Sequence, residues 1–176
     1  MLKVADCSRL LGKAYIGATQ LDLAEQAFDR AEACLEFTMN DETPQKLKFA
    51  QGLLAAAQGN HFLAINIFQE LFDAGKALGM VEYTTANAFE RAKSEMAIGL
   101  YDKAAKTFRQ LALTLKGTKS PITPLDALLQ LLTTYQLAGS VTDQELVLNE
   151  LFGMSEVTEN PELNNKLTLH LGVLLT

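Results

Sequence analysis

The chain has 176 residues, of which 48% are hydrophobic and 20% are charged, and its formal net charge is −6. A chain of this size buries about 70% of its unfolded surface, so no metal or disulfide is needed to hold a core. The acidic balance argues against a nucleic-acid partner, which requires clustered Lys and Arg, and no apolar run is long enough to cross a membrane. Cys7 and Cys34 lack CxxC spacing and no signal-peptide pattern is present, which favours a cytoplasmic protein with reduced thiols.

Apolar residues recur with the helical period along the chain, and no segment is typical of a β-strand. In chain order we expect helices near residues 4–18, 21–37, 44–58, 61–78, 83–98, 101–116, 124–138 and 142–153, with a last helix near 160–175. Asn160 and Pro161 favour the first turn of that last helix as N-cap and first helical residue. The stretch GTKSPITP, residues 117–124, is the clearest loop because one Gly and two Pro interrupt regular structure.

The segments repeat at a step of forty residues. AEQAFDRA at 24–31, AINIFQEL at 64–71 and AAKTFRQL at 104–111 share Ala-x-x-x-Phe, and QELVLNEL at 144–151 keeps the step with Leu148 in the Phe position. Small residues at Gly12, Gly52 and Ala92 predict that the two helices of a hairpin approach closely. The Ala of the Ala-x-x-x-Phe motif on the second helix is expected to pack into the space beside the small residue. The Phe is then expected to fill the space towards the next helix pair.

A second column of the repeat holds Thr19, Gly59, Gly99 and Gly139, each just past a helical segment. A left-handed C-cap favours Gly at that place. The first helix of each hairpin therefore has a defined end. A hairpin cannot bury its own apolar face alone, and stacking neighbouring hairpins buries it. We expect an all-α chain forming one array over residues 1–176, with units near 4–40, 44–80, 83–118 and 124–155 and a terminal helix at 160–175.

LGKAYIGATQLDLAEQAFDRA, residues 11–31, resembles the tetratricopeptide repeat (TPR). The family pattern is matched at Leu11, Gly12, Tyr15, Ala24, Phe28 and Ala31. The resemblance implies a right-handed superhelix of four TPR-like hairpins plus a terminal helix, and a role as a protein-binding scaffold or adaptor. The step is longer than the family's usual spacing of about 34 residues, so long second helices or long inter-repeat loops are expected.

Two narrower resemblances bear on function. TPLDALLQLLTTYQLAG, residues 123–139, which follows TTANAFERA at 84–92, resembles the end of the TPR region in subunit twelve of the TRAPP vesicle-tethering complexes. This resemblance implies a subunit of a complex for vesicle-mediated transport. QKLKFAQGLLAAAQG, residues 45–59, is similar to helical-repeat regions of signalosome and proteasome-lid subunits. The alternative function is therefore substrate recognition within a larger enzyme or such a regulatory assembly.

No catalytic, cofactor or metal site is expected, so the chain is predicted not to be an enzyme. His61 and His170 are far apart in sequence, and neither has a Cys or carboxylate cluster at metal-ligand spacing. No phosphate-binding loop and no nucleophile elbow occur. The acids at 41–42 fall in a polar turn, whereas paired catalytic carboxylates need a partly dry cleft.

In TPR arrays the first helix of each hairpin lines a concave groove, and the resemblance places three columns of this chain there. The columns are Arg9, Phe49, Phe89 and Leu129; Lys13, Leu53, Lys93 and Thr133; and Ile16, Ala56, Met96 and Gln136. The predicted partner-binding groove consists of Arg9, Lys13, Ile16, Phe49, Leu53, Phe89, Lys93 and Met96. The alternative, in which Phe49 and Phe89 only pack between repeats, is left open.

The groove predicts a protein partner with an acidic or apolar segment, helical or extended. Family members that bind chaperone C-termini use two Lys, two Asn and an Arg on these helices. The matching positions here are Arg9, Lys13, Ala50, Ala86 and Glu90, so a carboxylate clamp is not expected. The terminal helix is predicted to pack Leu163, Leu167 and Leu171 on the helix at 142–153 and to offer its other face for association.

Overall fold

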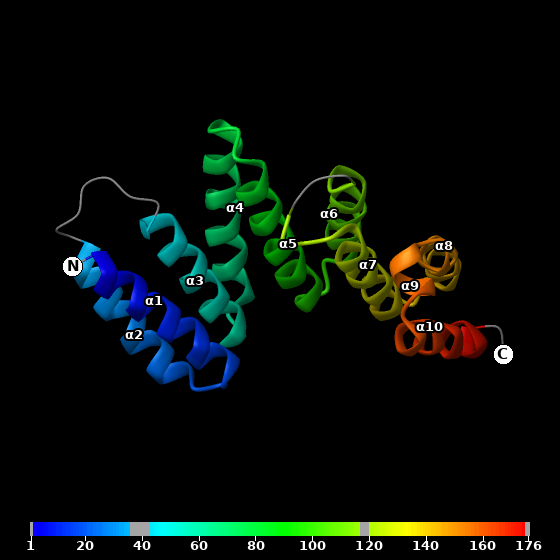
Figure 1. Ribbon diagram of the computed structural model, residues 1–176, viewed down its shortest axis with the longest axis horizontal. Coiled ribbons are helices and arrows are strands. Elements are labelled where there is room, and N and C mark those ends of the chain that lie inside the picture. The colour runs from blue at the N-terminus through cyan, green and yellow to red at the C-terminus, as the bar shows by residue number, and fades with distance from the viewer. Residues whose placement is uncertain (1, 36–42, 117–119, 175–176) are drawn as a thin grey trace. The chain divides into compact units, whose positions relative to one another are not determined.

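The computed structural model describes residues 2–35, 43–116 and 120–174, and within them every regular element is a helix (Figure 1). The bounds are α1 Leu2–Gly17, α2 Leu21–Leu35, α3 Thr43–Ala57, α4 His61–Ala77, α5 Val81–Ala97, α6 Tyr101–Thr114, α7 Pro124–Ala138, α8 Val141–Phe152, α9 Ser155–Thr158 and α10 Pro161–Leu174. The predicted all-α fold is confirmed. The four-residue α9 was not expected, and the acids at 41–42 lie outside the described residues.

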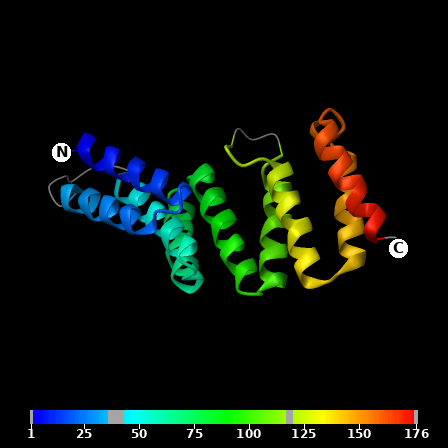
Figure 2. The same ribbon diagram turned by 90° about the horizontal axis from the view of Figure 1, so that it is seen from below.

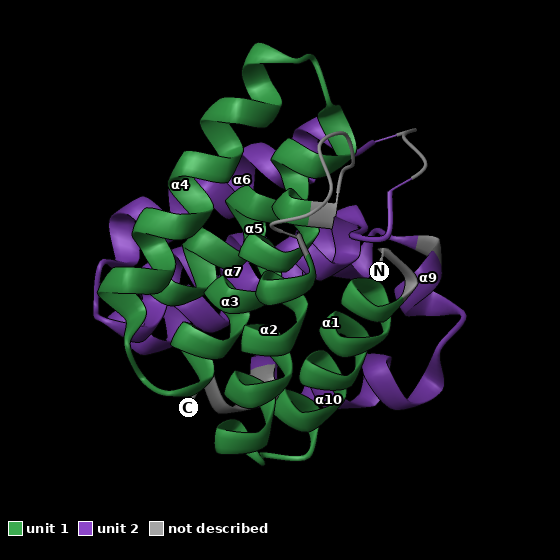
Figure 3. Cartoon of the chain, turned by 90° about the vertical axis from the view of Figure 1, so that its left-hand side faces the viewer, with its two compact units in different colours: residues 1–94 green, residues 95–176 purple. Residues whose placement is uncertain are grey.

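The chain divides into two compact units, residues 1–94 and 95–176, with the division inside α5 (Figure 3). Unit 1 holds the hairpins α1–α2 and α3–α4 and most of α5. Unit 2 holds the end of α5, then α6, the hairpin α7–α8, α9 and α10. In unit 1, α1 contacts α2, α2 contacts α3 and α3 contacts α4, and in unit 2, α6 contacts α7 and α7 contacts α8 (Figures 1 and 2).

The turns that close the hairpins share one backbone conformation. Gly59, Gly99 and Gly139 have φ of 79°, 80° and 72°, as expected for left-handed caps, and Thr19 has φ of 58°. In each turn the next amide donates to a carbonyl five residues back, with N–O distances of 2.9 Å for Gln20–Tyr15, 2.8 Å for Asn60–Ala55, 2.9 Å for Leu100–Glu95 and 3.0 Å for Ser140–Tyr135. This pairing satisfies carbonyls that a helix end leaves free.

Thr19 is the one β-branched residue in this column, and we expect Thr19→Gly to stabilise unit 1. A left-handed conformation costs an L-residue roughly 1–2 kcal/mol, and the added freedom of Gly in the unfolded chain offsets about 0.4–1 kcal/mol of that gain. The predicted net gain is therefore about 0.5–1 kcal/mol, measurable by urea unfolding. Gly59→Thr is the matched reverse substitution and should destabilise; if Thr19→Gly destabilises as well, the turn is not strained.

The contact between paired helices differs from the expectation in one respect. A Cβ added at Gly12 would overlap the ring of Phe28, and one added at Gly52 would lie 2.8 Å from Cε1 of Phe68. The Phe ring therefore fills the gap at the small residue of its own hairpin, where only the Ala was expected. Ala64 also meets α3, since it clusters with Ala55.

Asn160 caps the terminal helix and this helix contacts α8, as predicted, but only one of the three leucines expected to pack there is buried. The side-chain oxygen of Asn160 accepts a hydrogen bond from the Leu163 amide at 3.1 Å, which caps α10. α10 contacts α8 and α9, and Leu167 is buried while Leu163 and Leu171 are half-buried. The start of α7 is fixed by a reciprocal capping box between Thr123 and Asp126. These two caps set the positions of the helices that form the pocket described below.

Candidate protein-binding surface

The groove residues of α1 are placed on its polar side. Arg9 is half-buried and forms an ion pair with Asp6, with Nη2 and Oδ1 3.2 Å apart. Lys13 is exposed, and Ile16 is half-buried against the core cluster between α2 and α3. Part of the predicted basic edge is thus neutralised by an acid one turn away on the same helix.

Phe49 and Leu53 on α3 form the outer layer of the α3–α4 core. The Phe49 ring lies 5.5 Å from the Phe68 ring, centroid to centroid, in a tilted arrangement. Leu53 packs on the same buried cluster of Ala55, Ala64 and Phe68. Both side chains are half-buried, so each supports the core and still presents apolar surface.

Phe89 and Lys93 on α5 lie together. Phe89 is only 9% exposed, and the Lys93 ammonium is 5.8 Å from the centre of its ring, within the range of a cation–π contact. Lys93 also pairs with Glu90 at 2.9 Å. Burial of Phe89 supports the packing alternative for this residue, although Phe49 in the same column keeps an accessible edge.

Met96 belongs to unit 2. Its side chain is half-buried, and its sulfur accepts a hydrogen bond from the Thr134 hydroxyl at 3.2 Å. Thr134 is fully buried on α7. Met96 therefore joins the end of α5 to α7 within unit 2.

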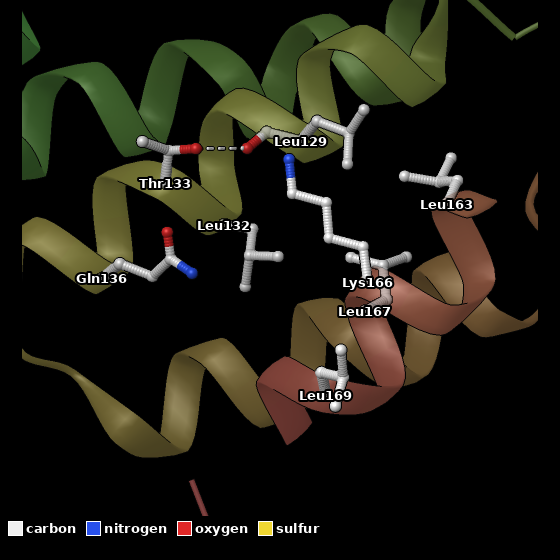
Figure 4. Close-up of a pocket in the computed structure, with 8 residues that line it drawn as sticks. All are labelled: Leu129, Leu132, Thr133, Gln136, Leu163, Lys166, Leu167 and Leu169. Carbon is white, nitrogen blue, oxygen red and sulfur yellow. Dashed lines mark hydrogen bonds between the residues drawn. The ribbon is translucent and has the colours of Figure 1, made fainter. Parts of the chain in front are cut away.

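A pocket of about 470 Å³ lies between α7 and α10 (Figure 4). Leu129, Thr133 and Gln136 on α7 line one wall, and they are the fourth members of the three predicted groove columns. The other wall is on α10 and consists of Leu163, Lys166, Leu167 and Leu169, with Leu132 at the base. Sequence reasoning missed the α10 wall, although the step of forty places Leu169 in the column of Arg9, Phe49, Phe89 and Leu129.

The pocket is mainly apolar with few polar groups. The Thr133 hydroxyl donates to the Leu129 carbonyl at 2.9 Å, so it is already engaged within α7. The Lys166 side chain extends from α10 towards α7 (Figure 4) and supplies a positive charge at the pocket. An apolar concavity with one cation suits an apolar segment that carries an acid.

The described ranges 2–35, 43–116 and 120–174 contain no cluster of three or more His, Cys, Asp or Glu side chains able to hold a metal ion. Within the same ranges, every helix is too short or too polar to cross a membrane. His61 is half-buried at the start of α4, and the side chain of His170 is outside the description.

No family model and no curated protein matches this sequence. Among solved structures, the chain is similar to a kinesin-light-chain-like protein of Podospora anserina with nearly identical TPR-like repeats. The TM-score is 0.73 at 17% identity, covering 90% of this chain and 79% of that one. A single-substitution variant of the same protein gives the same values. The described helices and this likeness together show that the chain has a TPR-like fold.

Proposed function

We propose that the chain is a protein-interaction scaffold or adaptor that binds a partner segment along the inner faces of its first helices. The observation that carries the proposal is the α7–α10 pocket, because its α7 wall, formed by Leu129, Thr133 and Gln136, comes from the groove columns that the repeat pattern predicts. A pocket volume of about 470 Å³ lies within the range of sites that bury most of a small ligand. TPR-like folds are typical scaffolds without catalysis, in keeping with the absence of catalytic motifs.

The partner segment is proposed to be apolar with at least one acidic residue. Leu129, Leu132 and Leu163 offer apolar contact area, and Lys166 offers the charge. In unit 1, Phe49 and Leu53 on α3 offer half-buried apolar surface, and Lys13 on α1 is an exposed cation. Charge at the rim would steer association more than it adds affinity.

Membership of a larger complex is part of the proposal, and two versions follow from sequence resemblance alone. The first is a TRAPP-like vesicle-tethering complex in the cytoplasm, and no relative of that kind supports it. The second is substrate recognition for a signalosome-like or proteasome-lid-like assembly. The identity of a captured partner separates these versions.

Leu169→Asp should abolish partner recovery without changing stability. The Leu169 side chain is 73% exposed and lines the pocket, so the substitution places an acid in the site at little cost to folding. We expect affinity purification with quantitative mass spectrometry to show partners of the wild-type chain reduced at least tenfold for this variant, at an unchanged melting temperature.

Leu146→Asp is the matched control, because Leu146 on α8 is 61% exposed and does not line the pocket. It should retain the partners. The proposal for the pocket fails if Leu169→Asp keeps them, or if both variants lose them equally.

A further inference from the structure

The pocket between α7 and α10 has a length that both helices define. Its wall on α7 runs from Leu129 to Gln136, and its wall on α10 runs from Leu163 to Leu169. Because an α-helix rises about 1.5 Å per residue, these walls are about 10 Å and about 9 Å long. A segment that fills the pocket therefore contacts it over about 10 Å of its own length.

The volume of the pocket favours an extended backbone over a helix. In packed sheets, strands lie about 4.8 Å apart, layers lie about 10 Å apart and each residue rises about 3.4 Å, so one extended residue occupies about 160 Å³. The pocket of about 470 Å³ holds roughly three such residues, which also span about 10 Å. A helix enclosed over the same length needs about 800 Å³, because its diameter is about 10 Å or more.

A hydrogen-bond acceptor in the pocket favours the same conformation. The Thr133 hydroxyl donates its hydrogen to the Leu129 carbonyl at 2.9 Å, which leaves the lone pairs of its oxygen to accept. The amides of an extended segment have no partner within the segment, whereas those inside a helix are already paired. Thr133 can therefore accept a hydrogen bond from an amide of an extended segment.

Lys166 supplies the charge that faces the pocket, and it is the one charged residue among the described lining residues. It is exposed, it extends from α10 towards α7 (Figure 4), and it forms no ion pair within the part of the chain that the structure describes. Asp126 is held in the capping box of α7, and Glu162 is exposed and does not line the pocket. The positive charge is therefore available to an acid of the partner.

The base and the rim of the pocket differ in chemistry. Leu132 and Leu167, each 4% exposed, are its most deeply buried lining residues, whereas Lys166 is exposed. Successive side chains of an extended segment point to opposite sides. The first and third side chains can therefore contact the buried leucines while the second is directed to Lys166.

We infer that the occupant of the α7–α10 pocket is an extended segment of another protein, about three residues long, with an acidic residue between two apolar ones. This inference rests on the function proposed above and specifies the length, conformation and order of the partner segment. Lys166 then selects an acid over a base at the central position, and the buried leucines select apolar residues on both sides of it.

The test uses the full chain and a fluorescent synthetic peptide with Leu-Asp-Leu at its centre. Gly-Ser repeats on both sides keep the peptide flexible and non-helical. We expect the chain to bind this peptide more tightly than a matched peptide with Leu-Lys-Leu. In a Lys166→Glu chain, affinity for Leu-Asp-Leu should fall about fivefold or more and affinity for Leu-Lys-Leu should rise, because one accessible charge pair changes from attraction to repulsion.

Lys103→Glu is the matched control. Lys103 is exposed on α6 and does not line the pocket, so this substitution changes the net charge equally and should leave both affinities unchanged. The conformation is tested with an alanine-rich helical peptide that presents Leu, Asp and Leu on one face. This peptide should bind more weakly than the extended one.

The inference is overturned if the full chain does not bind the Leu-Asp-Leu peptide at about 1 mM, if Lys166→Glu leaves the preference between the two peptides unchanged, or if the helical peptide binds more tightly. These failures are distinct from failure of the proposed function. A chain that loses its partners on Leu169→Asp but fails the peptide tests is a scaffold whose pocket binds another kind of segment, whereas partners retained by Leu169→Asp would refute the function itself.

Discussion

Phe68→Ala and Phe108→Ala are each expected to lower the free energy of unfolding by about 3–5 kcal/mol, the usual result of emptying a buried Phe site. Both rings are fully buried. Phe68 fills the space over Gly52, clusters with Ala55 and Ala64, and meets the Phe49 ring. Few of these neighbours can move into the space left behind, because they belong to helices fixed by other contacts. Urea unfolding followed by circular dichroism measures the loss.

Phe28→Ala should have a smaller effect. Its ring is as well buried as the others and packs over Gly12, but Leu10 and Leu11 on α1 are exposed, so α1 can unfold locally with less loss of contact. Phe62→Ala is the control, because Phe62 is 71% exposed on α4 and should change stability by less than about 0.5 kcal/mol. Losses below about 1 kcal/mol at Phe28, Phe68 and Phe108 alike would contradict the packing role of this column.

Leu167→Ala should destabilise unit 2 by about 2–5 kcal/mol, as expected for a large aliphatic side chain removed from a core. Leu167 is 4% exposed on α10, and α10 contacts α8, whose Val147, Leu148 and Leu151 are fully buried. The variant should therefore expose the α8 face and bind a hydrophobic dye at lower urea concentration.

Leu169→Ala is the matched control on the same helix, two residues away and 73% exposed. It should unfold like the wild-type chain. Equal stability of both variants would show that α10 does not cap the apolar face of α8.

The helices could be predicted from sequence because their periodicity, caps and repeat agree with one another. α9 could not, since four residues at 155–158 carry no period. Thr19 was not recognised as a left-handed residue because a β-branched side chain disfavours that conformation, and only the shared column hinted at it. The Gly59, Gly99 and Gly139 caps, by contrast, followed directly from residue type and place.

The candidate site was only half predictable. Phe49 and Phe89 occupy one column, yet Phe49 meets the Phe68 ring while Phe89 lies under Lys93. Their exposure therefore depends on neighbours that differ between repeats, which a column cannot reveal. The α7 wall of the pocket followed from the columns. Predicting the α10 wall required treating the terminal helix as the first helix of a fifth repeat, which places Leu169 in the same column as Leu129.

The left-handed turns divide residues 60–139 into two segments of equal length, each of which could be removed or duplicated as a unit. Residues 60–99 and 100–139 each begin after a Gly of positive φ and end on another, at equal length. Excising residues 60–99 would join Gly59 to Leu100, so both sides of the junction would keep the backbone conformation they already have. Phe108 would then stand at the spacing from Gly52 that Phe68 now occupies. Insertions and deletions in proteins of this design should therefore span whole forty-residue segments. Any other length would shift all later residues out of their positions in the repeat.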